Sequence, residues 1–92
     1  MRILVPVLLL ALLLPGCAGQ TSGRDRCAQL LDAAWKDLDL AKAQGFAGTV
    51  SYGKALALLT RSKANQSVED FKECSSTAER AHFYVSESRK GR

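Results

Sequence analysis

The chain has 92 residues and carries 13 Lys and Arg against 9 Asp and Glu, which gives a net charge of +4. A chain of this length supports one small hydrophobic core. Length and composition therefore predict a single small domain.

An apolar run from Ile3 to Leu14 follows the basic start Met1-Arg2 and is interrupted only by Pro6. A helix of about twelve residues covers roughly 18 Å, which is short of the roughly 30 Å needed to cross a bilayer. A basic tip, a short apolar stretch and small residues after it are typical of a secretory signal peptide. We expect residues 1–16 to be removed.

The segment Leu14-Pro15-Gly16-Cys17 resembles the lipobox of bacterial lipoproteins, with Pro15 where that family more often has Ala or Ser. The resemblance implies that Cys17 becomes the mature N-terminus and carries a diacylglycerol on its sulfur and an acyl chain such as palmitate on its amine. Several acyl chains would form a durable membrane anchor. The alternative is an ordinary signal peptide cleaved nearby, which leaves Cys17 unpaired.

Residue 18 is Ala rather than the Asp that resembles an inner-membrane retention signal, so the resemblance implies transport to the periplasmic face of the outer membrane. Residues 17–24 are small and polar with two glycines, and this composition predicts a short, lipidated, flexible tether. Residues 25–90 then form the folded domain.

Two cysteines remain once Cys17 carries lipid, and an even number in an exported chain predicts a disulfide between Cys27 and Cys74. The expected mature chain of 76 residues, 92 minus 16, is small enough to need such a cross-link. Two buried free thiols are one alternative. A metal site made with His82 is another, although it lacks a fourth ligand.

Three amphipathic helices are predicted after residue 24, with apolar residues at alternating steps of four and three. The first runs from Asp25 to a stop at Gly45, the second from Ser51 to Ala64, and the third from an N-cap at Ser67 to near Ser88. The sequence therefore predicts an all-α fold, a small three-helix up-down-up bundle. The expected inward residues are Cys27, Leu30, Leu31, Ala34, Trp35, Leu38, Ala41, Tyr52, Ala55, Leu56, Leu58, Leu59, Phe71, Cys74, Ala78, Ala81 and Val85.

Two short segments, Trp35-x-x-Leu38 and Ala78 to Ala81 with Tyr84, resemble part of a tetratricopeptide repeat. No 34-residue period extends along the chain, so no peptide-binding residue is transferred from that family. Close packing of a helical bundle explains the same alanines.

The sequence contains no recognisable set of catalytic residues. His82 is three residues after Glu79, a spacing common on solvated helix faces, and no base is placed beside Ser75 or Ser76. We therefore expect a protein that is not an enzyme and that needs no cofactor beyond the covalent lipid on Cys17.

Charge suggests where a partner could bind. No acidic residue lies between Leu40 and Val68, which leaves Lys54, Arg61 and Lys63 of the second helix as candidate contacts for an anionic partner. Arg89, Lys90 and Arg92 form a second basic cluster on an expected frayed tail. The alternative for both is a solvated cationic surface.

These observations predict a small, lipid-anchored, non-enzymatic envelope protein that acts as a structural or interaction module. Its candidate partners are the membrane, another envelope protein, anionic lipid and cell wall, with nucleic acid excluded by export. The alternative function is a periplasmic carrier or inhibitor that binds a soluble ligand or enzyme.

Overall fold

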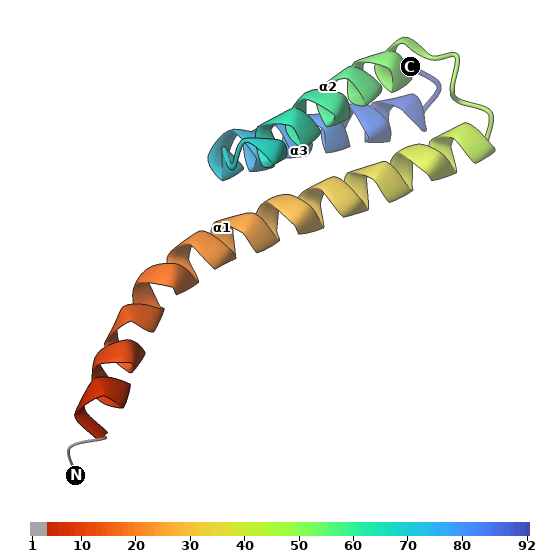
Figure 1. Cartoon of the computed structure of the whole chain (residues 1–92). Helices are drawn as coiled ribbons and strands as arrows, with labels where there is room; N and C mark the ends of the chain where they lie inside the picture. Colours follow the sequence, from red (N-terminus) through yellow and green to blue (C-terminus); the bar gives the residue numbers. More distant parts are fainter. Residues whose placement is uncertain (1–3) are drawn as a thin grey trace.

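The computed structural model of the chain describes residues 4–92, with side chains from residue 23 onward. It contains three helices, α1 (Leu4–Ala43), α2 (Val50–Ser67) and α3 (Phe71–Ser88), and the described residues form no strand. Successive helices run in opposite directions and join through short links, so that α2 and α3 lie together along the second half of α1 (Figure 1). The predicted all-α, up-down-up bundle is confirmed.

Helix α1 starts earlier than expected. Its bounds include the backbone of residues 17–24, which were predicted to be a flexible tether, and Asp25 is therefore an interior residue and not an N-cap. No proline follows Pro15 in this helix, so no residue after it lacks the N–H group that helical hydrogen bonding requires. Removal of residues 1–16 stays a prediction.

The end of α1 lies where the sequence predicted it. Gly45 has φ of 92°, a left-handed conformation that glycine adopts without a steric penalty. Its N–H group donates to the carbonyl of Lys42, and the N–H of Phe46 donates to the carbonyl of Ala41. This pair of hydrogen bonds is a Schellman motif, which satisfies carbonyl groups that the helix end leaves free.

Both later helices begin with a side-chain cap. Thr49 accepts a hydrogen bond from the N–H of Tyr52 and starts α2. Asp70 accepts one from the N–H of Glu73 and starts α3. The predicted cap at Ser67 is wrong, because Ser67 is the last residue of α2 and its hydroxyl donates to the carbonyl of Lys63.

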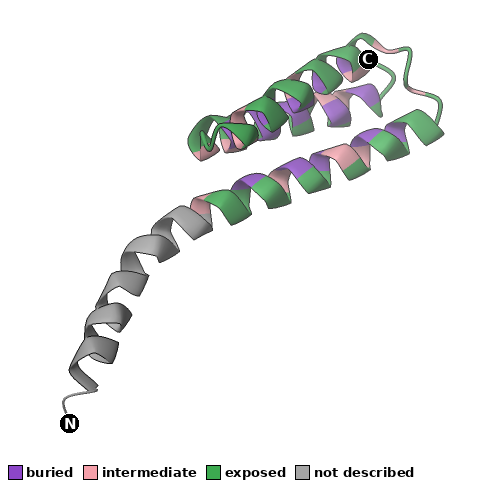
Figure 2. Cartoon of the chain, in the orientation of Figure 1, coloured by how far each residue is buried: buried purple, intermediate pink, exposed green. Residues whose placement is uncertain are grey.

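The core lies where the three helices meet, along the purple faces in Figure 2. Most of the predicted inward residues are buried there, and those only partly buried are Leu30, Trp35, Tyr52, Leu58 and Phe71. Leu56 is 40% exposed, which makes that prediction wrong. The buried face of α2 passes through Ala55, Leu59 and Ser62, and Leu56 lies at its edge.

Candidate functional site

The strongest cross-link in the fold is a disulfide between Cys27 of α1 and Cys74 of α3. Their Cα atoms are 5.6 Å apart, a separation that suits a disulfide, and both residues are completely buried. The buried hydroxyl of Ser62 on α2 donates a hydrogen bond of 2.7 Å to the carbonyl of Cys74. All three helices are therefore held together at one level.

Cys17, the predicted lipidation site, lies outside the residues whose side chains the structure describes. Arg24, seven residues later, is already fixed to the bundle. Its guanidinium lies 3.0 Å from a carboxylate oxygen of Glu69 and over the ring of Phe71, 5.4 Å from the centroid. A seven-residue segment reaches at most about 24 Å, so an anchor at Cys17 would keep the bundle close to the membrane.

The three basic residues predicted on α2 do not form one patch. Lys54 and Arg61 are seven residues apart and share a helix face, and the Lys54 ammonium lies 5.3 Å from the ring centroid of Tyr84 on α3. Lys63 lies on the other side of α2, where it borders a shallow groove with Asp32 and Trp35 of α1. The structure brings the first two together and separates the third from them.

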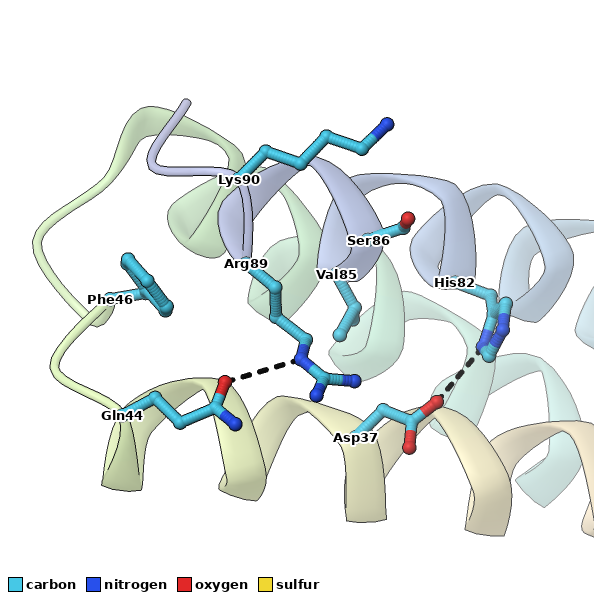
Figure 3. Close-up of a pocket in the computed structure, with 8 residues that line it drawn as sticks. All are labelled: Asp37, Gln44, Phe46, His82, Val85, Ser86, Arg89 and Lys90. Carbon is cyan, nitrogen blue, oxygen red and sulfur yellow. Dashed lines mark hydrogen bonds and ion pairs between the residues drawn. The ribbon is translucent and has the colours of Figure 1, made fainter.

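A second groove, of about 680 Å³, lies between α1, the link after it and the end of α3 (Figure 3). The Nε group of Arg89 donates a hydrogen bond of 3.2 Å to Gln44, and His82 Nδ1 is 3.7 Å from a carboxylate oxygen of Asp37. Phe46 and Val85 supply apolar surface. The sequence analysis did not foresee this groove, because its residues come from three separate segments.

The chemistry of this groove does not include an activated nucleophile. Ser86 lies on the same helix as His82, but among the hydrogen bonds of the described residues none joins the two side chains. Asp37 is too far from His82 Nδ1 for a strong hydrogen bond.

The basic tail is ordered, contrary to the prediction that it frays. Glu87 forms ion pairs with Lys90, at 3.3 Å, and with Arg92, at 3.1 Å. The carbonyl of Arg92 accepts a hydrogen bond from the N–H of Ser51 at the start of α2. The hydrogen bond from Lys90, and then that from Arg92, hold the pKa of Glu87 below its usual 4.5, against the opposing effect of burial.

A set of aspartates that the sequence analysis missed lies on the exposed side of α1. Asp25, Asp32 and Asp39 follow one another at intervals of seven residues and are all exposed. Seven residues are close to two helical turns, so these carboxylates share one face. Their heptad spacing is the signal that could have revealed them.

In the part of the chain that the structure describes, no group of three or more His, Cys, Asp or Glu side chains is arranged to hold a metal ion. None of the described helices has both the length and the hydropathy that membrane crossing requires. Comparison of the chain with protein-family models, curated proteins and solved structures finds no significant match. The function is therefore argued from the chain's own residues.

Proposed function

We propose that this chain is a small lipid-anchored protein of the cell envelope, held by Cys17 at the periplasmic face of the outer membrane, and that it acts as a non-enzymatic interaction module. The buried disulfide between Cys27 and Cys74 is the observation that carries the proposal. Disulfides persist in oxidising compartments outside the cytoplasm, which agrees with the signal-like N-terminus and with the lipobox resemblance.

The surface of the bundle supports binding rather than catalysis. Lys54 and Arg61 present positive charge on α2, while the groove beside His82 is open to solvent and contains no activated nucleophile among the described residues. Charged surfaces of this kind steer and orient a partner of opposite charge. The partner classes supported by this surface are another envelope protein, anionic lipid and cell-wall material.

A carrier or inhibitor is the second candidate, and one observation favours it. The groove in Figure 3 is lined by the cations Arg89 and Lys90 and by the apolar side chains of Phe46 and Val85, which would suit a small anionic ligand with an apolar body. Cross-linking in intact envelopes followed by purification separates the two functions. An interaction module should recover a membrane or wall component, and a carrier should recover a soluble one.

The anchor is tested with Cys17→Ser in cells given labelled fatty acid. The unchanged chain should take up label and fractionate with the outer membrane, and the variant should do neither. Thr60→Ala is the control, because this exposed change leaves the lipobox, the disulfide and the core intact. Uptake of label by Cys17→Ser would refute lipidation at this residue, and a steady inner-membrane pool of the unchanged chain would refute the outer-membrane location.

A further inference from the structure

The aspartates on the outside of α1 form a regular acidic stripe, which we define as Asp25, Asp32 and Asp39. Among the described residues none of the three carboxylates forms an ion pair, whereas Arg24 and Arg26 are occupied by Glu69 and Glu79. Ala28 and Trp35 lie between the aspartates at the same helical spacing. Lys36 lies within the acidic stripe, four residues after Asp32 and three before Asp39, and Lys42 follows it. Lys63 of α2 borders the same groove as Asp32. These three cations partly offset the charge of the acidic stripe.

A matching cationic stripe lies on the outside of α2, and we define it as Lys54 and Arg61. Ala57 and Ala64 alternate with these cations, and Val68, which is 74% exposed, continues the same spacing. No acidic residue lies on α2 to neutralise this face. Both stripes repeat every seven residues, or about 10.5 Å along a helix, so the spacing between the two cations equals the spacing between successive aspartates.

Within one chain the stripes cannot meet, because they lie on different sides of the bundle. Asp32 of the acidic stripe borders the groove between α1 and α2. Lys54 of the cationic stripe instead lies over Tyr84 of α3. Contact between two acidic or two cationic stripes would be repulsive. The complementary contact therefore joins the cationic stripe of one copy to the acidic stripe of another, a head-to-tail arrangement.

The heights of the stripes are compatible when two copies stand side by side. Ser62 is hydrogen-bonded to Cys74, which is bonded to Cys27, so these three residues mark one level. Because α2 runs opposite to α1, the residue before Ser62 is at the height of the residue after Cys27. Arg61 of one copy is therefore at the height of Ala28 in the other, and Lys54 is at the height of Trp35. Along the helix axis each cation is then about 5 Å from the aspartate on either side of it. The long side chains of lysine and arginine span that distance.

We propose that the partner of the cationic stripe is the acidic stripe of a second copy of this chain. The proposal rests on the proposed function, because lipid anchors in one membrane would point every α1 the same way and so place α2 of one copy antiparallel to α1 of its neighbour. Exposed ion pairs are individually weak and are screened by salt. Confinement to a membrane raises the effective concentration of copies and makes such a weak contact effective.

The test uses the full chain, expressed with two different tags and treated in intact envelopes with a carbodiimide that joins lysine amines to carboxylates. A link from Lys54 to Asp32 or Asp39 should join the two tagged copies. Arg61→Glu leaves the Lys54 amine in place but adds repulsion, and we expect it to reduce this link about fivefold or more. Lys72→Glu, an exposed change of the same charge outside the stripe, should leave it unchanged.

Reciprocal exchange of charge makes the test specific for a second copy. Lys54→Glu with Arg61→Glu should abolish the link between stripes, and so should Asp32→Lys with Asp39→Lys, when either chain is expressed alone. When the two chains are expressed together, each altered stripe can meet a stripe of opposite charge on the other chain. The cross-link between the two tags should then be restored. Circular dichroism of each variant checks that the helices are retained.

Absence of the Lys54 link in the unchanged chain, an equal yield from Arg61→Glu, or failure of the co-expressed pair to restore it would each overturn the proposal. Anionic lipid is the partner if Arg61→Glu weakens co-sedimentation with vesicles of anionic phospholipid and co-expression of the two charge-reversed chains does not restore the cross-link. Labelled fatty acid in the same samples reports on the anchor separately. Loss of that label would refute the proposed function, while the cross-link decides the contact between copies.

Discussion

The hydroxyl of Ser62 on α2 donates a hydrogen bond of 2.7 Å to the main-chain carbonyl of Cys74 on α3. Because Cys74 is also joined to Cys27 on α1, this contact completes a junction of all three helices. Ser62 is fully buried, so its hydroxyl would have no water to bond with if this partner were lost. The junction fixes the level of α2 against the other two helices.

Ser62→Ala should therefore destabilise the bundle by about 1 kcal/mol, because it removes a buried hydrogen bond and little volume. The matched control is Thr60→Ala, since Thr60 is exposed and its hydroxyl bonds only to the carbonyl of Leu56 in its own helix. We expect the control to change stability by less than about 0.5 kcal/mol. Urea unfolding of both variants measures the difference, and equal free energies would contradict the role of Ser62.

Removing the disulfide should have a larger effect. The bridged cysteines are 47 residues apart, and chain-entropy theory gives about 4 kcal/mol for closing a loop of that size. A core of this size contributes only about 3 to 5 kcal/mol, so Cys27→Ala with Cys74→Ala should leave the domain largely unfolded at 37 °C. Thermal unfolding by circular dichroism measures this, and an unchanged melting temperature would contradict it.

The start of α3 depends on Asp70 rather than on Ser67. Asp70→Ala removes the side chain that accepts from the N–H of Glu73, and loss of such a cap should cost about 0.5 to 2 kcal/mol. Ser67→Ala is the matched control, because the Ser67 hydroxyl only donates to a carbonyl of its own helix. A greater loss of stability from Ser67→Ala than from Asp70→Ala would restore the cap predicted from sequence.

The pH dependence of the C-terminal tail follows from Glu87. Its pKa is lowered in the folded state, so its pairing with Lys90 and Arg92 is present above the usual carboxyl pKa of 4.5 and is lost as pH falls through the lower folded value. A titration of the Glu87 carboxyl carbon by NMR should give a midpoint below 4.5. A midpoint at or above that value would show that the tail is not held by these pairs.

Local patterns predicted the helices and the core of this protein well. The spacing of Cys27, Leu31, Ala34 and Leu38 indicated the buried face of α1, and Gly45 marked its end because left-handed backbone suits glycine. These features depend on residues close together in the chain. The disulfide was also predictable, because only two cysteines remained to pair once Cys17 was assigned to lipid.

Apart from the disulfide, features that depend on how separate segments pack together were not predictable. Leu56 is exposed because the buried face of α2 passes through Ala55, Leu59 and Ser62, and Leu56 lies at its edge. The C-terminal tail is ordered because Glu87 binds its cations and Arg92 reaches Ser51. The groove beside His82 combines residues of α1, of the link after it and of α3, and no single segment contains its pattern.

The intact mass of the mature protein, purified from envelopes without reducing agent, tests the account most directly. A lipid-anchored chain should have the mass of residues 17–92 increased by a diacylglycerol and an acyl chain on Cys17, and reduced by two hydrogens for the bond between Cys27 and Cys74. Reduction should restore those two hydrogens and leave the lipid in place. A mass that contains residues 1–16, or that lacks the lipid, would contradict the central claim of a lipid-anchored protein.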